Sequence, residues 1–329
     1  MPALRRRDFI MLLGGASAAW PLAAWAQQAA MPVVGFVSNS SPEAGRIAAF
    51  RKGLSETGIV EGQNVTVEYH WLSGQFDRVP SLMADLVRRR AAVIATPASN
   101  LAALAAKAAT TTIPIVFGVG EDPVKLGLVA SLARPGGNAT GINFFAQETT
   151  AKRLGLLHDL VPNAVRIAVL VNPANAPTAE AVLRDIPEAA RAIGLQIQFL
   201  NASTGREIEA AFATLVRDQA DALFVASDGF FVSRRVQLAT LAVHYRIPAA
   251  YPTREAVEVG GLMSYAADAV DSFRHVGVYT GQILKGAKPV DLPVLQSTKF
   301  EFVINAQTAR LLGIEVPNAL HLLADEVIE

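Results

Sequence analysis

Apolar segments of this 329-residue chain recur in its second half in the same order and at nearly constant spacing. The matched pairs are 34–38 (VGFVS) with 168–172 (AVLVN), 92–96 (AVIAT) with 222–226 (ALFVA), and 113–117 (IPIVF) with 247–251 (IPAAY). The first and third pairs share an offset of about 134 residues. Because the three pairs keep one order, we predict two similar lobes built from one chain. Two α/β lobes that face each other form a cleft, and such a cleft suits a small ligand.

Strand and helix patterns alternate along the chain. Continuous apolar runs are typical of parallel strands covered on both faces, and segments with apolar residues at helical spacing follow them. The predicted strands are 33–37, 65–69, 93–96, 113–117, 167–171, 195–199, 223–226, 249–251 and 300–304. The predicted helices are 42–54, 79–90, 101–109, 149–160, one that ends at 193, and 270–284. The alternation predicts an α/β protein with two doubly wound parallel sheets.

The repeat also predicts where the lobes begin and end. We expect lobe 1 to span residues 31–142 and lobe 2 to span residues 143–268. The residues left over are too few for a third domain of this type, so 269–298 should return to lobe 1 and 299–329 to lobe 2. The chain then crosses near 142, 268 and 298, which gives a three-stranded hinge.

Residues 1–26 have the pattern of an export signal peptide. Arg5, Arg6 and Arg7 precede an apolar stretch, and 24–26 (AWA) is a small-x-small cleavage site before Gln27. Residues 6–10 (RRDFI) resemble the twin-arginine signal that is read by an export receptor. A run of three arginines also suits the general export route, so both routes stay open.

A membrane anchor is the alternative for this segment. Gly14, Gly15 and Pro21 interrupt the apolar stretch, whereas a membrane-spanning helix needs about 20 consecutive apolar residues. The sequence has no cysteine, so neither a disulfide nor a lipid on a cysteine is expected. We therefore expect a protein that is soluble in the periplasm after cleavage and has no lipid anchor.

Charge and motifs exclude several function classes. Cleavage removes three arginines and one aspartate, which takes the formal net charge from 0 to −2 and gives no electrostatic reason to bind nucleic acid. No dinucleotide, phosphate-loop or nucleophile-elbow motif occurs, and the five histidines lack the spacing of a zinc site. We expect no enzymatic activity, no cofactor and no metal.

Polar, turn-rich loops follow the predicted strands at their carboxyl ends, where ligands bind in doubly wound sheets. Short side chains and exposed backbone amides in such loops suit an anionic group such as a carboxylate, although helix capping is the alternative role for the same residues. The candidate ligand contacts are Asn39, Ser40, Ser41, Thr96, Ala98, Ser99, Gly118 and Asp122 in lobe 1, and Asn172, Asn175, Thr178, Ser227, Asp228, Phe230, Tyr251 and Tyr265 in lobe 2.

Asp228 is the most distinctive of these candidates. Its carboxylate lies beside two phenylalanines at a strand end, a combination that suits an ammonium group next to a ring or apolar tail. We expect Asp228 to hold a cationic or hydrogen-bond-donating group, and Ser40, Ser41, Ser99 and their loop amides to hold a carboxylate. As an exposed cleft group, Asp228 should contribute little to the stability of the ligand-free protein.

Motifs along the whole chain are shared with one known family. They are 7–10 (RDFI) with 13–16 (LGGA), 50–54 (FRKGL), 133–141 (ARPGGNATG), 260–265 (GGLMSY), 283–289 (ILKGAKP), 299–301 (KFE) and 324–329 (ADEVIE). Through them the chain resembles the tryptophan/tyrosine-type periplasmic substrate-binding proteins of ABC transporters. The resemblance implies a monomeric type I two-lobe binding protein that closes on a small organic ligand and delivers it to a permease and its ATPase. Aromatic amino acids are among the family's ligands, and other amino acids or carboxylates remain open.

Two other function classes share this fold or cleft. An exported enzyme would need a nucleophile–base pair or a metal set, which the sequence does not display. The effector-binding lobes of a transcription repressor would need an N-terminal helix-turn-helix, where this chain has an apolar, cleavable segment. Turnover of a bound ligand would distinguish the enzyme from a binding protein.

Overall fold

A computed structural model describes residues 31–39, 42–144 and 146–329. The chain divides into two units, Met1–Pro32 and Val33–Glu329, and the fold below is that of the second unit. The predicted export signal lies outside the described residues, as do Ser40 and Ser41. In the part of the chain that is described, no helix has the length and apolar character needed to cross a membrane.

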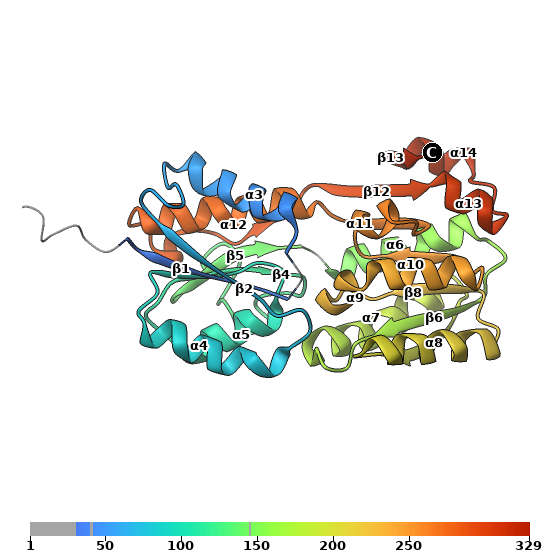
Figure 1. The fold of residues 1–329 in the computed structure, drawn as a ribbon, viewed down its shortest axis with the longest axis horizontal. Helices are drawn as coiled ribbons and strands as arrows, with labels where there is room; N and C mark the ends of the chain where they lie inside the picture. Colours follow the sequence, from blue (N-terminus) through green and yellow to red (C-terminus); the bar gives the residue numbers. More distant parts are fainter. Residues whose placement is uncertain (1–30, 40–41, 145) are drawn as a thin grey trace, which may run out of the picture. The chain divides into compact units, whose positions relative to one another are not determined.

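Lobe 1 contains a parallel sheet that is six-stranded in the described residues, in the order β11-β5-β4-β3-β1-β2. Figure 1 shows β1, β2, β4 and β5 of this sheet. Its strands are β1 (Val33–Ser38), β2 (Thr66–Trp71), β3 (Val93–Thr96), β4 (Ile115–Val119), β5 (Ala139–Asn143) and β11 (Leu295–Gln296). The central strands β3 and β4 are buried along their whole length, as expected for apolar runs covered on both faces.

Helices cover both faces of this sheet. They are α3 (Ala44–Glu56), α4 (Val79–Arg88), α5 (Asn100–Ala109) and α12 (Ala269–Leu284), with short 3-10 turns η1 (Phe76–Arg78) and η2 (Pro289–Asp291). Helices α4 and α5 share one apolar cluster with the sheet, and α3 and α12 share the other. Gly53 and Gly277 allow α3 and α12 to touch, since a Cβ on Gly53 would lie 1.9 Å from the Arg274 carbonyl oxygen.

Lobe 2 contains the other sheet, seven-stranded in the described residues, in the order β13-β12-β10-β9-β8-β6-β7. Its strands are β6 (Arg166–Val171), β7 (Gln196–Asn201), β8 (Ala222–Val225), β9 (Ala249–Tyr251), β10 (Met263–Ala267), β12 (Phe300–Asn305) and β13 (Glu326–Ile328). Strands β10 and β12 pair antiparallel, whereas β10 with β9 and β12 with β13 pair parallel. The reason is the direction of β12, which enters lobe 2 from lobe 1.

Helices also cover both faces of the lobe 2 sheet. They are α6 (Ala146–Leu160), α7 (Ala176–Ala192), α8 (Gly205–Arg217), α9 (Gly229–Ser233), α10 (Arg235–His244), α11 (Arg254–Glu258), α13 (Ala306–Leu312) and α14 (Asn318–Leu323). Helices α6, α7, α13 and α14 contribute to one apolar cluster, and α8 to α11 contribute to the other. Each lobe is therefore a sheet between two helical layers.

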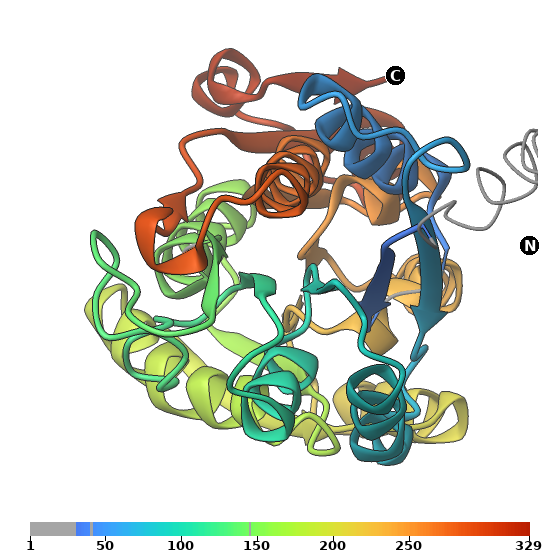
Figure 2. The ribbon, with the colours of Figure 1, turned by 90° about the vertical axis from the view of Figure 1, so that its left-hand side faces the viewer.

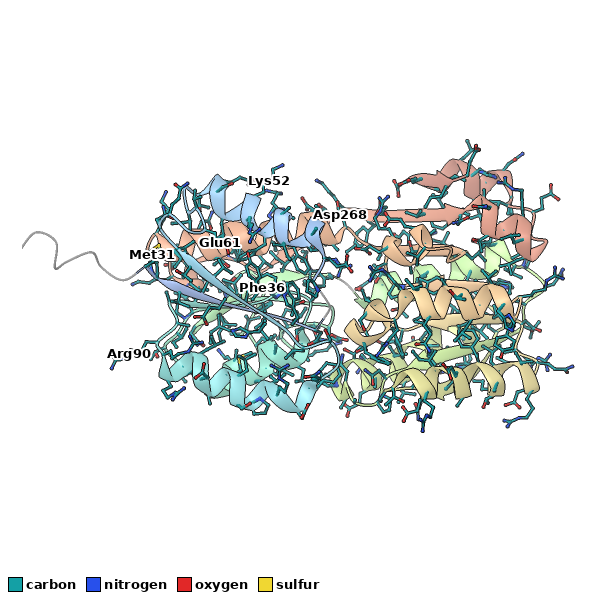
Figure 3. The ribbon with its side chains drawn as sticks, in the orientation of Figure 1. Met31, Phe36, Lys52, Glu61, Arg90 and Asp268 are labelled. Atoms are coloured by element: carbon teal, nitrogen blue, oxygen red, sulfur yellow. The ribbon has the colours of Figure 1, made fainter. Side chains whose placement is uncertain are left out.

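The described chain passes between the two sheets three times. It leaves lobe 1 after β5, returns after β10 and crosses again between β11 and β12. Figure 2 shows α12 beside α3, although more than two hundred residues separate them in the chain. In Figure 3, Asp268 lies on the second crossing, where its side chain accepts a hydrogen bond from the Asp271 amide and caps α12.

Candidate ligand-binding cleft

A cleft of about 170 Å³ lies between the lobes, beyond the carboxyl ends of their parallel strands. The loops after β1, β3 and β4 line it from lobe 1, and the segments after β6, β8 and β9 line it from lobe 2. Six predicted contacts line the cleft: Asn39, Ala98, Asn175, Thr178, Ser227 and Asp228. The strand-end rule thus identified the loops that surround the space.

Asp228 lies at the lobe 2 side of the cleft and is 6% exposed. Its Oδ1 accepts hydrogen bonds from Asn172 Nδ2 at 2.8 Å and from the Phe230 amide at 2.9 Å. Its Oδ2 accepts one from Asn175 Nδ2 at 2.7 Å. Burial raises the pKa of this carboxyl, and the three donors oppose the change. The prediction of an exposed carboxylate was therefore wrong, because Asp228 caps α9 and ties two loops together.

Four other predicted contacts are buried beneath the loops and do not line the cleft. Ser99 caps α5 by accepting from the Ala102 amide, and its hydroxyl donates to Asn39 Oδ1 at 2.6 Å. Asn172 binds Asp228 as described above. The other two are Thr96 and Gly118, which end or nearly end β3 and β4. These residues hold the loops in position, and a direct role at the ligand stays a prediction.

The predicted aromatic contacts Phe230, Tyr251 and Tyr265 pack within lobe 2 and do not line the cleft. Phe230 and Tyr251 are 5% and 1% exposed and pack in the apolar cluster with α8 and α10. Tyr265 stacks on Phe300, with ring centroids 6.1 Å apart.

The predicted contact Asp122 is exposed beside a neighbouring pocket, where its carboxylate accepts a hydrogen bond from the Val124 amide at 2.8 Å.

One arginine of the cleft was not predicted from the sequence. Arg46 on α3 lines the cleft and is 5% exposed. Its Nη2 donates to Glu255 Oε1 of lobe 2 at 2.8 Å, and its guanidinium lies 5.8 Å from the centre of the Phe273 ring. Burial raises the pKa of Glu255, but the charge and hydrogen bond of Arg46 outweigh it, so this pKa lies below its ordinary value. A cation in the first turn of a helix opposes the helix dipole, which is the signal that marks Arg46 in the sequence.

Glu121 lies in a loop that was predicted to line the cleft, but its carboxyl was not predicted as a contact. Glu121 follows β4, and its backbone carbonyl accepts from Asn143 Nδ2 at 2.8 Å. The side chain lines the cleft and the neighbouring pocket. Burial raises the pKa of Glu121 to about 7, against the opposing effects of Arg184 and the Thr178 hydroxyl. The carboxyl therefore lies near its midpoint of ionisation at neutral pH.

Contacts between the lobes surround the cleft. Besides Arg46 and Glu255, Arg235 Nη1 of lobe 2 lies 2.9 Å from Glu43 Oε1 of lobe 1. Asn100 Nδ2 lies 3.4 Å from the Thr178 hydroxyl across the same space.

Two rings, Phe144 and Phe273, face the cleft from lobe 1. Among the residues described, no group of three acidic, histidine or cysteine side chains is arranged to hold a metal ion.

Two lobes, a hinge and a cleft lined from both sides define a two-lobe ligand-binding protein. Residues 31–328 match the family model of the ABC transporter substrate binding proteins, and the chain belongs to that family. This confirms the resemblance found in the sequence and places the chain among substrate-binding proteins rather than enzymes.

Similar proteins support the assignment. A "Tyrosine-binding protein" of Clostridioides difficile (strain R20291) is 26% identical over 280 residues, which cover 84% of this chain and 80% of the relative. A conserved domain protein from Vibrio cholerae has a TM-score of 0.81 at 25% identity and covers 90% of this chain and 99% of its own. A domain from Streptococcus pneumonia in complex with L-Trp has a TM-score of 0.78 at 25% identity, with 91% and 100% covered.

Proposed function

We propose that the chain is the solute-binding component of an ABC importer and that its cleft takes a free amino acid with an aromatic side chain. The observation that carries the proposal is a cleft that combines two phenylalanine rings with ionisable groups from both lobes. The relative named for tyrosine and the similar structure that holds L-Trp support the same ligand class.

The apolar part of the cleft suits a ring. Phe144 and Phe273 face it from lobe 1, and Val232, Ala266 and Ala267 line it from lobe 2. An aromatic pair adds about 0.5–1.5 kcal/mol to the free energy of apolar burial, provided the rings stack offset or edge to face. An aromatic side chain between these surfaces therefore binds more tightly than an aliphatic one of similar size.

Closure of the lobes provides the signal for transport. A ligand that moves the population from 1% to 99% closed needs about 5.5 kcal/mol more affinity for the closed form. Hydrogen bonds to charged groups contribute about 1.5–3 kcal/mol each, so two such bonds and one buried ring are sufficient. The closed protein then docks on the permease, and hydrolysis of ATP by the partner ATPase drives release and import.

The site of action follows from the proposed export signal. We expect the mature chain to start at Gln27 and to act as a monomer in the periplasm, without a lipid on a cysteine, because the sequence has none. The ligand contacts are expected among the predicted residues that line the cleft, with Arg46, Glu121, Phe144 and Phe273 added.

A ligand screen on purified residues 27–329 tests the proposal. We expect L-tryptophan, L-tyrosine or L-phenylalanine to raise the melting temperature and to bind in calorimetric titration, with L-leucine and glutamate weaker by tenfold or more. Binding of a sugar or a dicarboxylate in place of every aromatic amino acid would contradict the ligand class. Uptake of the labelled ligand by cells with and without this chain then tests its role in import.

A further inference from the structure

Two charged side chains in the cleft each carry a buried polar atom that has no hydrogen-bond partner in the described part of the chain. They are Arg46, at Nε, and Glu121, at Oε2. A buried polar atom without a partner costs about 1–3 kcal/mol, and more when the group is charged. A donor and an acceptor of this kind in one cleft call for a ligand that supplies the opposite groups.

The Arg46 guanidinium is held in place by residues of both lobes. Glu255 accepts from its Nη2, the Phe273 ring lies alongside, and the side chain of Arg46 is 6% exposed. Because the guanidinium is planar and carries five N–H donors, the bond to Glu255 leaves donors for a second acceptor. A carboxylate is the acceptor that matches such a group best.

The Glu121 carboxyl is the complementary group. Asp228 also faces the cleft, but its two oxygens already accept three hydrogen bonds. Glu121 Oε2 accepts none from the described residues, and burial disfavours its ionised form. An ammonium group placed beside Glu121 would supply both the missing donor and the missing charge.

Arg46 and Glu121 line the same cleft from the same end of the lobe 1 sheet. Arg46 follows β1 and Glu121 follows β4, and β3 alone separates these strands in the sheet. Ala98, in the loop after β3, lines the same cleft.

We propose that Arg46 binds the carboxylate of a free amino acid and that Glu121 binds its ammonium group, so that the cleft selects for both charges. The assignment rests on the function proposed above and refines it. Arg46 also pairs with Glu255 of lobe 2, so the residue that binds the carboxylate is itself a contact between the lobes. Occupation of the cleft and closure are thereby coupled through one guanidinium.

Three probes and two variants test the assignment. The probes are L-tryptophan, tryptamine, which lacks the carboxylate, and indole-3-propionate, which lacks the ammonium group. The wild-type protein should prefer L-tryptophan to each analogue by about 30-fold or more. In Arg46→Gln, affinity for L-tryptophan should fall about 30-fold and its preference over tryptamine should shrink to within about threefold, while the preference over indole-3-propionate persists. In Glu121→Gln the preference for L-tryptophan over indole-3-propionate should shrink, while the preference over tryptamine persists.

Two controls separate ligand contact from closure and from folding. Glu255→Ala removes the acceptor of the contact between the lobes but keeps the Arg46 charge, so it should weaken the binding of all three probes by a similar factor. Arg46→Lys should restore part of the preference over tryptamine. Unchanged preferences in Arg46→Gln or Glu121→Gln, with wild-type binding intact, would overturn the assignment. Failure of the wild-type protein to bind any aromatic amino acid would instead reject the proposed function itself.

Discussion

Gly229 of lobe 2 lies directly against Asn39 of lobe 1, so that a Cβ built on Gly229 would come within 2.6 Å of the Asn39 Cβ and 2.8 Å of its carbonyl carbon. Real Cβ atoms do not approach backbone so closely. Asn39 has little room to move away, because its side chain accepts a hydrogen bond from Ser99. A glycine at this position is therefore a condition for contact between the lobes.

Replacing Gly229 by alanine should weaken ligand binding by tenfold or more, because the added methyl group holds the lobes apart. Calorimetric titration with the ligand from the screen measures the effect. Gly155→Ala on α6 is the control, since no described heavy atom lies within 4 Å of a Cβ there. The control should bind normally and gain roughly 0.5–1 kcal/mol of stability, because alanine is the better helix former. Equal affinities for both variants would contradict the prediction.

Asp228→Ala should lower the free energy of unfolding of the ligand-free protein by about 2–4 kcal/mol. The substitution removes the cap of α9, worth about 1 kcal/mol, and leaves the buried amides of Asn172 and Asn175 without an acceptor. Urea unfolding checks the value. Asp122→Ala removes an exposed carboxylate from the other lobe and should change the stability by no more than about 0.5 kcal/mol. A loss equally small for Asp228→Ala would show that its hydrogen bonds are weak.

Glu121 should make the stability depend on pH between its ordinary pKa of 4.5 and its raised pKa of about 7. Between these pH values the folded protein keeps the Glu121 carboxyl proton, whereas the unfolded chain releases it. The stabilising contribution of the protonated carboxyl is therefore present below pH 4.5 and is lost as the pH rises to about 7. The loss reaches at most about 3 kcal/mol. Arg184 lowers this pKa and Asp185 raises it, and the Thr178 hydroxyl faces the same carboxyl.

Unfolding of wild-type protein and Glu121→Gln at several pH values isolates this contribution as the difference between the two. If the difference in stability between the two proteins stays constant from pH 4.5 to 7, the pKa of Glu121 is not raised in the folded state. Binding an ammonium group beside Glu121 should lower its pKa, so a ligand added at pH 6–7 should release a proton. Titration in buffers with different ionisation enthalpies counts that proton.

Export by the twin-arginine route predicts that Arg6→Lys combined with Arg7→Lys leaves the precursor in the cytoplasm, because the receptor reads the paired guanidinium groups. Arg5→Lys keeps the pair and is the matched control. Cell fractionation followed by N-terminal sequencing should find Gln27 first in the exported wild-type and control proteins. Normal export of the double variant would assign the chain to the general route.

The order of the elements was predictable because parallel strands leave a simple pattern. Strands β1, β3, β6 and β8 are runs of Val, Ile, Leu, Phe and Ala with few polar residues, and the predicted strands match the structure to within two residues. Strands β5 (ATGIN) and β10 (MSYAA) were missed because polar residues interrupt their apolar runs. Their strand conformation comes from pairing next to the hinge rather than from local preference.

The site was predictable at the level of loops but not of side chains. Asn39 and Ser99 have similar sequence contexts, yet one lines the cleft and the other caps a helix. Arg46 and Phe273 come from helices, which a rule about strand ends does not consider. Phe273 reaches the cleft because α12 packs on lobe 1, although it comes from far along the chain. No local sequence pattern predicts this packing.

The packing of α12 on α3 also determines when lobe 1 can be finished during synthesis. Strands β1 to β5 have all been made once the ribosome passes Asn143, but α12 is complete only at Leu284. At about 5–20 residues per second, roughly 7–28 s pass between these points. Throughout that interval Phe36 and Phe50 lack the cover that Phe273 and its neighbours on α12 later provide. Part of one apolar face of the first sheet is thus left without its final cover until α12 has been made.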